Sequence, residues 1–392
     1  MERELKGSPK ETNMKMILLI FLIHFTGDFY GSFVNPLLPA FVEKFSLNLT
    51  QVGILAAIGR ILSFVIQPPV GYVADHYRTR FFVVGGPLFS ILFLPLAGIA
   101  PNFPVLFLLI ALGSMGSSMY HPTAAGMVST YSGSRFAFSM ALYNFGGTFA
   151  FGCGPIFITY VVSRYGLSAS PYTAALGLII MALIFRKIPL PGQEGLKNFG
   201  FFASLREVFG DVWKAVALIW ALAVFRTFVG QSFQTFIPVL FSREGYSLLS
   251  VGLIVSLFNV GGALGGLLAG MLADRMGYKP VLYMVFGLSV PALYLLLFVP
   301  KGALPFSFLS GCFIMSALPL FVAMAQEMAP RGKSMASSLM IGLAYGTGGM
   351  MTPITGRLAD HFSIRPVLSV MAMLPLLMMV LVYFMPAGKS SR

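Results

Sequence analysis

Ionisable and amide side chains recur at helical spacing inside the long apolar runs of this sequence. His24, Asp28 and Asn35 fall at i, i+4 and i+11, on one face of a helix that also carries Gly31. Because an ionisable group within hydrocarbon is costly, such residues indicate function. A carboxyl group binds a proton when desolvated and releases it beside a cation, so we interpret Asp28 as a candidate proton carrier. A permanent ion pair between Asp28 and Arg60 or Arg226 is the structural alternative.

Three further apolar runs carry polar residues of the same kind. His121, which precedes Pro122, is a candidate second proton site or substrate donor, and a hydrogen-bonded packing histidine is the alternative. Neither Arg60 nor Arg226 can lose its charge, and one Asp28 cannot neutralise both, so at least one guanidinium is left for an anionic group. The side chains expected to line a substrate cavity are His24, Asn35, Arg60, Gln67, His121, Arg226 and Gln234.

The composition identifies an integral membrane protein. Of the 392 residues, 57% are hydrophobic and 10% are charged, with a mean hydropathy of +0.84. A single soluble core cannot bury that much apolar surface. The apolar runs are long enough for helices that cross a membrane and too continuous for the alternating strands of a barrel. We find no nucleophile beside a base and no metal-ligand cluster, so we expect no enzyme, no cofactor and no bound metal.

Gly, Pro and charge clusters divide the sequence into twelve expected spans. The expected domains are a cytoplasmic arm (1–13), a six-helix bundle (14–187), a cytoplasmic linker (188–211), a second six-helix bundle (212–385) and a cytoplasmic tail (386–392). The expected spans are 14–41, 49–73, 81–99, 103–127, 137–162, 169–187, 212–241, 248–273, 280–299, 303–329, 335–357 and 363–385.

The two halves of the sequence repeat one another. Gly31 aligns with Gly230, and Pro39 aligns with Pro238, without gaps between them. Parallel repeats of six spans, related by a pseudo-two-fold axis, are typical of transporters in which two bundles rock about a central site. The expected fold class is therefore all-α integral membrane, with twelve helices in two bundles.

Basic residues indicate the orientation in the membrane. Lys and Arg are concentrated in the two termini and in the loops that join even-numbered to odd-numbered spans, which predicts that both termini are cytoplasmic. The net charge of +13 follows from this bias and indicates contact with anionic lipid, with no need for a nucleic-acid partner. We expect a monomer in the inner (plasma) membrane.

A pattern of Gly, three residues, Asp, four residues and a base occurs at two equivalent places in the repeat, "GYVADHYRTR" (71–80) and "GMLADRMGYK" (270–279). This pattern resembles the signature loop of the major facilitator superfamily, and the resemblance extends over all twelve spans. It implies that the Asp acts as a latch that favours one access state. The implied gate residues are Gly71, Asp75, Arg78, Arg80, Gly270, Asp274 and Lys279. A short polar turn is the alternative, and "GRLADHFSIR" (356–365) has the same spacing on the opposite, outer face.

Within the superfamily, "GSSMYHP" (116–122), "QPPVGYVADHY" (67–77) and the pair His24 and Asp28 resemble the fosmidomycin-resistance branch of bacterial drug exporters. The resemblance implies proton-coupled efflux, by antiport, of a small organic molecule or drug, and the arginines suggest an anionic one. One alternative is a proton-coupled importer of an organic anion. An alternative of another class is a non-transporting membrane sensor or assembly protein.

Overall fold

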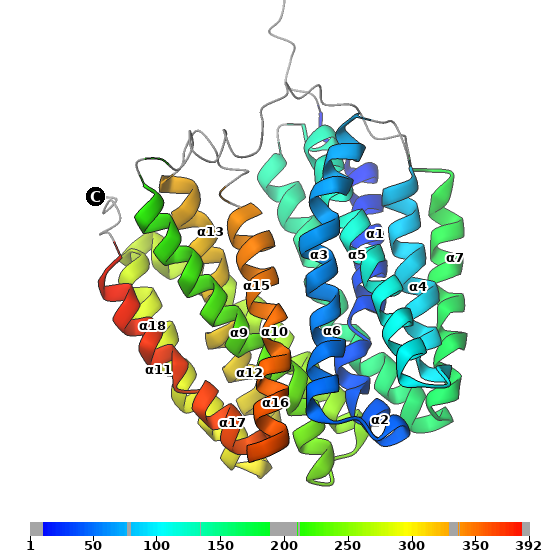
Figure 1. The fold of residues 1–392 in the computed structure, drawn as a ribbon. Coiled ribbons are helices and arrows are strands. Elements are labelled where there is room, and N and C mark those ends of the chain that lie inside the picture. The colour runs from blue at the N-terminus through cyan, green and yellow to red at the C-terminus, as the bar shows by residue number, and fades with distance from the viewer. Residues whose placement is uncertain are drawn as a thin grey trace, which may run out of the picture. The chain divides into compact units, whose positions relative to one another are not determined.

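The structure is a computed structural model that describes residues 11–76, 80–133, 135–188, 210, 212–328, 336 and 338–385. In this part of the chain the regular secondary structure is helical and contains no strand (Figure 1). Eleven helical runs in it are long and apolar enough to cross a membrane. The remaining expected span, 335–357, includes residues outside the described part. The expected arm, linker and tail also lie mostly outside it.

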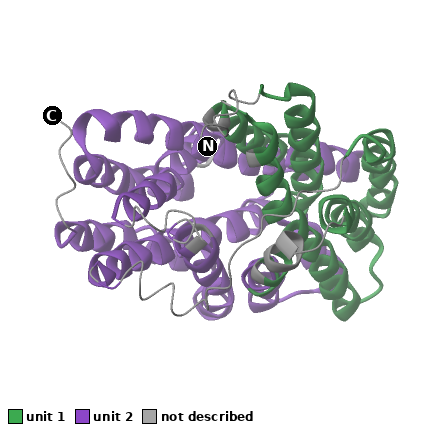
Figure 2. Cartoon of the chain, turned by 90° about the horizontal axis from the view of Figure 1, so that it is seen from above, with its two compact units in different colours: residues 1–33, 65–154, 165–196 green, residues 34–64, 155–164, 197–392 purple. Residues whose placement is uncertain are grey.

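The chain divides into two compact units (Figure 2). Unit 1 comprises Met1–Phe33, Val65–Gly154 and Tyr165–Leu196, and unit 2 comprises Val34–Phe64, Pro155–Arg164 and Lys197–Arg392. Unit 2 thus combines segments from both halves of the sequence. The expected bundles, 14–187 and 212–385, remain a prediction from the sequence repeat.

The first half of the chain forms α1 (Met14–Gly31), α2 (Val34–Phe45), α3 (Leu49–His76), η1 (Phe81–Gly85), α4 (Gly86–Leu96), η2 (Ala97–Ile99), α5 (Phe103–Tyr131), α6 (Phe136–Tyr165), η3 (Leu167–Thr173) and α7 (Ala174–Phe185). The second half forms α9 (Trp213–Arg243), α10 (Leu248–Met276), α11 (Tyr278–Phe298), η4 (Pro300–Gly302), α12 (Ala303–Ile314), α13 (Ala317–Met328), η5 (Ser338–Ala344), α15 (Tyr345–Met350), α16 (Thr352–Phe362), α17 (Ile364–Met371) and α18 (Leu374–Tyr383).

Several expected spans are interrupted where proline removes a backbone donor. Pro36 lies four residues after Ser32, where α1 gives way to α2, and Pro319 lies four residues after Met315, between α12 and α13. Proline has no N–H, so it cannot bond the carbonyl four residues earlier, and the helix breaks there. The carbonyl of Met315 consequently needs another donor.

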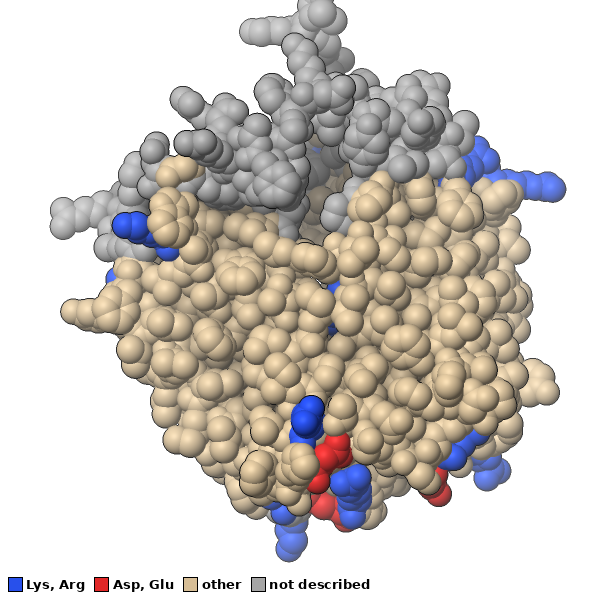
Figure 3. All heavy atoms as spheres, viewed as in Figure 1, with Lys and Arg blue, Asp and Glu red and all other residues tan. Residues whose placement is uncertain are grey.

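Large apolar side chains cover much of the surface, as expected of helices in lipid. Leu183, Leu267 and Val370 are each about two-thirds exposed, at 68%, 67% and 66%. On the face drawn in Figure 3, charged side chains are sparse and lie mostly near the ends of the helices. This distribution agrees with an integral membrane protein.

Candidate functional site

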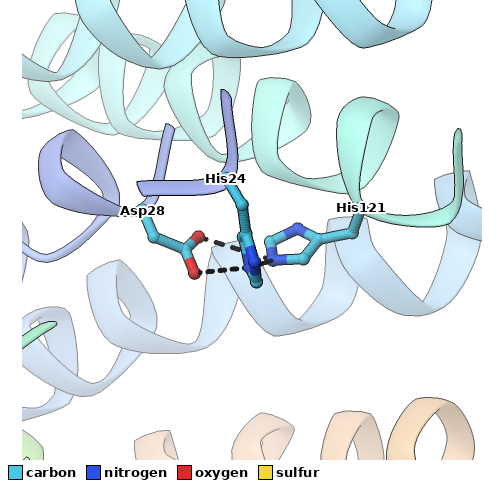
Figure 4. Close-up of side chains that lie close together, drawn as sticks. All are labelled: His24, Asp28 and His121. Atoms are coloured by element: carbon cyan, nitrogen blue, oxygen red, sulfur yellow. Dashed lines mark hydrogen bonds and ion pairs between the residues drawn. The ribbon is translucent and has the colours of Figure 1, made fainter. Parts of the chain in front are cut away.

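Three of the predicted residues meet within unit 1, at the contact between α1 and α5 (Figure 4). His24 and Asp28 lie one turn apart on α1, with His24 Nε2 3.1 Å from Asp28 Oδ2. His121 on α5 places its Nε2 3.4 Å from Asp28 Oδ1 and 3.2 Å from His24 Nε2. We call these three side chains the His–Asp cluster. The single polar stripe seen in the sequence therefore becomes a site only when α5 is packed against it.

The other nitrogen of each ring determines what the cluster can bind. His24 Nδ1 lies 2.7 Å from the backbone oxygen of Tyr143, and His121 Nδ1 lies 2.7 Å from that of Ser117. A carbonyl only accepts, so each Nδ1 carries hydrogen, and each Nε2 of a neutral ring has a lone pair. Two lone pairs and a carboxylate would then face one another. One additional proton on either Nε2 removes this repulsion and supplies hydrogen bonds.

Two tyrosines and a glycine complete the surroundings of the cluster. The Tyr120 hydroxyl donates to Asp28 Oδ1 at 2.5 Å, and the Tyr143 ring stacks on His24 with 4.0 Å between centroids. On α6, a Cβ added at Gly147 would lie 2.6 Å from Asp28 Oδ2 and 2.7 Å from His24 Nε2. Only glycine allows this approach of α6 to the cluster.

These residues are functional candidates that the sequence did not reveal. Tyr120 adjoins His121 in the "GSSMYHP" segment, which was the available signal for it. Gly147 belongs to a small-residue stretch that indicates helix packing in general and carries no sign of a carboxylate partner. Tyr143 acts on His24 through its ring and its backbone, and neither contact has a sequence signature.

The expectation that the chain has no metal-ligand cluster needs correction. The candidate ligand atoms of His24, Asp28 and His121 all lie within 4.8 Å of one another, which is compact enough to hold a metal ion. The cluster has no signature in the sequence, because 93 residues separate Asp28 from His121 and only the fold brings them together. Two imidazoles and one carboxylate serve equally well for holding a proton.

Arg226 lies in unit 2 at the break between α12 and α13. The guanidinium is 2% exposed; its Nε donates to the oxygen of Ile314 at 2.9 Å and its Nη2 to the oxygen of Met315. Arg226 thus supplies the donor that Pro319 lacks, at the negative end of α12. No ion pair among the described residues includes Arg226, whereas the ion-pair partners of Asp28 are His24 and His121.

Arg60 and Gln234 also lie in unit 2, each with a polar or aromatic partner. The Arg60 guanidinium lies over the ring of Tyr345, 4.5 Å from its centroid, and the Tyr345 hydroxyl accepts from Gln231 Nε2 at 2.8 Å. Gln234 Nε2 donates to Asn259 Oδ1 at 2.8 Å. These contacts orient the polar groups of α3 and α9.

The other predicted cavity residues are placed less specifically. Asn35 on α2 and Gln67 on α3 are half-buried. Gln67 belongs to unit 1 with His24 and His121, and Asn35 belongs to unit 2 with Arg60, Arg226 and Gln234. Their expected convergence in one cavity remains a prediction.

The predicted gate residues lie at helix ends. Gly71 and Asp75 fall in the last two turns of α3, and Gly270 and Asp274 in those of α10. Arg80 precedes η1, and Lys279 Nζ donates to the oxygen of Tyr383 at 3.2 Å. Arg78 lies outside the described residues. The latch role stays a prediction.

Comparisons with known proteins bear on the class. A family model described as "Major Facilitator Superfamily" matches residues 19–339. The chain is 26% identical over 382 residues to the "Fosmidomycin resistance protein" of Escherichia coli, covering 95% of this chain and 93% of that one. It is 25% identical over 239 residues to the "Quinolone resistance protein NorA" of Staphylococcus aureus, covering 59% of this chain and 60% of that one.

Two solved structures have the same fold. A bacterial homolog of the human lysosomal transporter Spinster, in an inward-facing and occupied conformation, superposes with a TM-score of 0.80 at 16% identity, covering 96% of this chain and 97% of that one. The nucleoside transporter NupG superposes with a TM-score of 0.74 at 15% identity, covering 95% and 99%.

The helical spans and the full-length matches define a multi-pass membrane transporter, not an enzyme. The chain belongs to the Major Facilitator Superfamily. The expected fold class and the resemblance to the fosmidomycin-resistance branch are both confirmed, and a small-molecule substrate follows from the family.

Proposed function

We propose that this transporter exports a small organic molecule or drug in exchange for protons, and that the His–Asp cluster is the coupling site. The observation that carries the proposal is the convergence of His24 Nε2, His121 Nε2 and the Asp28 carboxylate within 3.1–3.4 Å. With both Nδ1 atoms bonded to carbonyls, this arrangement favours one bound proton. The efflux names of the relatives agree with export.

His121 is the proposed entry point for the proton. Its side chain is 30% exposed, compared with 7% for His24 and 9% for Asp28. A proton can therefore reach His121 Nε2 first and be shared with the other two groups. Bound protons reduce the negative charge of the cluster, and substrate binding has to favour their release for exchange to occur.

A substrate anion would bind at the buried arginine of unit 2. The carbonyls of Ile314 and Met315 occupy Nε and Nη2 of Arg226, and its charge is not neutralised by any described carboxylate. A buried guanidinium attracts a carboxylate or phosphonate group strongly. This supports the anionic substrate class, for which fosmidomycin is the first compound to test.

The remaining features of the proposal follow from charge and composition. The distribution of Lys and Arg supports an inner-membrane protein with both termini in the cytoplasm, where anionic lipid surrounds it. We propose that one chain forms the working unit, since the coupling site is built from α1, α5 and α6 of a single chain.

Transport in proteoliposomes that contain a pH-sensitive dye tests the proposal. Adding a panel of anionic and neutral drugs, fosmidomycin included, should produce proton movement opposite to the movement of the drug. Proton and drug movement in the same direction would indicate the importer instead. Substrate uptake that neither requires nor creates a pH difference would exclude proton coupling.

A further inference from the structure

Asp360 caps a helix that lies more than three hundred residues earlier in the chain. Its Oδ1 accepts from the backbone N–H of Leu49 at 2.7 Å, and its Oδ2 accepts from the N–H of Thr50 at 2.9 Å and from the Thr50 hydroxyl at 2.6 Å. Leu49 and Thr50 begin α3. The first N–H groups of a helix have no partner within that helix, and a carboxylate there also meets the positive end of the helix dipole.

Residues next to the start of α3 also form a local cap, but that cap does not bond the N–H groups of Leu49 and Thr50, which donate to Asp360. Asn48 Oδ1 accepts from the N–H of Gln51 at 2.8 Å, and Gln51 Oε1 accepts from the N–H of Asn48 at 3.0 Å. This local box satisfies Gln51 and Asn48 only. Local and distant acceptors therefore complement each other at the start of α3.

Close backbone packing continues below the cap. The Thr352 hydroxyl donates to the oxygen of Gly53 at 3.0 Å, and a Cβ added at Gly53 would lie 2.7 Å from the Thr352 oxygen. A Cβ added at Gly356 would overlap the backbone oxygen of Leu49. The start of α3 and the helix α16 thus touch backbone to backbone within unit 2, and we call this contact the α3–α16 clamp.

The clamp joins the two halves of the sequence repeat. The Gly356, Asp360 and Arg365 spacing is the third copy of the pattern found at the two predicted gates. Arg365 does not bond Asp360; its Nη2 pairs with Glu244 Oε1 at 2.6 Å, which links α17 to the end of α9 within the second half. The Asp side chain of this copy bonds the start of a helix from the first half, and Gly356 packs against the same backbone.

We propose that Asp360 is a gate residue that holds the outer end of the transport path closed. The charge distribution places residues 44–49 and 357–365 on the outer face. A transporter whose halves rock about a central site must separate α3 from α16 there whenever its outer side opens. The three bonds to Asp360 form in the closed state and break in the open one, so they favour closure. This inference is independent of the coupling ion and of the substrate.

Spin labels at the outer ends of the two halves test the proposal. Lys44→Cys at the end of α2 and Lys301→Cys in η4 place labels at exposed positions, in a Cys153→Ala/Cys312→Ala background that retains transport. Double electron–electron resonance then gives the ratio of open to closed populations. Asp360→Ala should raise the open-to-closed ratio on the order of tenfold, the effect of removing an N-cap. Asp360→Asn, which keeps an acceptor, should raise it less.

The matched control is Glu244→Gln on the same face. It also removes one carboxylate charge and weakens a bond of 2.6 Å, but both partners belong to the second half, so the distance distribution should not change. Thr50→Ala, which removes one of the three donors, provides a test that does not depend on folding of the Asp360 variants. Distance distributions identical to that of the parent in Asp360→Asn and Thr50→Ala, at unchanged Tm, would overturn the proposal. An equal shift in Glu244→Gln would overturn it as well.

Discussion

The Nε2 atoms of His24 and His121 face each other at 3.2 Å while the Nδ1 atom of each ring donates to a backbone carbonyl. These two bonds fix the rings so that both lone pairs point at one place, beside Asp28. The cluster is therefore preorganised to bind a cation. A proton suits it because transfer among three groups within hydrogen-bond distance needs little movement.

Asp28→Asn should abolish transport driven by a pH gradient. The amide cannot take up a proton, and it removes the negative charge that draws a proton to the two imidazoles. The protein should still insert, fold and bind substrate, because Asn can accept from Tyr120 as Asp28 does. Substrate-induced proton release in weakly buffered detergent solution should disappear. The protein is treated with a chelator first, so that displacement of a metal ion is not mistaken for proton release. Concentrative transport by the variant would shift the assignment to His121.

Tyr120→Phe should move the pH profile of transport to higher pH. The hydroxyl donates to the Asp28 carboxylate and favours its charged form, so removing the donor makes the cluster bind its proton more tightly. The loss of a hydrogen bond to a charged group corresponds to a shift of about one pH unit. Transport rates from pH 5 to 9 measure the shift. Tyr143→Phe is the control, because its hydroxyl donates to the oxygen of His121, not to Asp28. An unchanged midpoint of the pH profile, with a transport rate that is lower at every pH, would indicate that Tyr120 has only a packing role in the structure.

Arg226→Gln should discriminate between charged and neutral substrates. Loss of a buried charge-assisted bond should weaken an anionic substrate by roughly 30-fold and a neutral analogue by less than about threefold. The variant should also lower Tm, because the shorter, uncharged Gln amide cannot reproduce the two charge-assisted bonds to Ile314 and Met315. Arg60→Gln is the comparison, since the Arg60 guanidinium lies over an aromatic ring. Equal losses of affinity for both ligands would mean that Arg226 has only a structural role, as donor to the free carbonyls between α12 and α13.

The sequence predicted the class, the positions of eleven of the twelve expected spans and the three residues of the cluster, because apolar length and isolated ionisable groups are local signals. It could not predict the pairing of Asp28 with Tyr120 and His121, which depends on how α1 and α5 face each other. The role of Arg226 shows the same limit. Its partners are carbonyl groups freed by Pro319, and a backbone acceptor has no residue type to recognise.

The third copy of the Gly–Asp–base pattern has a partner that the sequence does not reveal. Its spacing on the expected outer face favours a simple polar turn, yet Asp360 makes three bonds to the start of α3. Asp360 lies in the last turn of α16. The partner 310 residues away was invisible, because capping of a distant helix leaves no periodic signal.

The α3–α16 clamp should weaken only at low pH. Burial would raise the pKa of Asp360, but hydrogen bonds from Thr50 and Leu49, together with the neighbouring His361, hold it below its ordinary value of 3.8. A carboxyl with a lowered pKa stabilises the closed state above its ordinary pKa and loses this effect as pH falls through the lowered one. The label distance should therefore be constant from pH 7 to 5 and lengthen below about 4. His361→Gln should keep a low-pH transition, because Asp360 is unchanged, and Asp360→Asn should show none. A transition near pH 6 that persists in Asp360→Asn would contradict the assignment of the pH dependence to Asp360.

Asp75→Asn and Asp360→Asn should have opposite effects on the access equilibrium. If the predicted latch at Asp75 keeps the inner side closed, its loss favours the inner-open state, whereas loss of Asp360 favours the outer-open state. In the parent protein the outer-open population is expected to be small, so a further decrease would be hard to measure. Asp360→Ala raises this population and is therefore the background in which a decrease can be measured. Adding Asp75→Asn there should reduce the long-distance population of the Lys44→Cys/Lys301→Cys pair, because effects at distant sites are additive and the two substitutions act in opposite directions. Transport by the double variant should recover toward the parent rate, because neither state is then strongly favoured. A further increase in the long-distance population would show that Asp75 and Asp360 favour closure of the same side, and the inner latch would then be rejected.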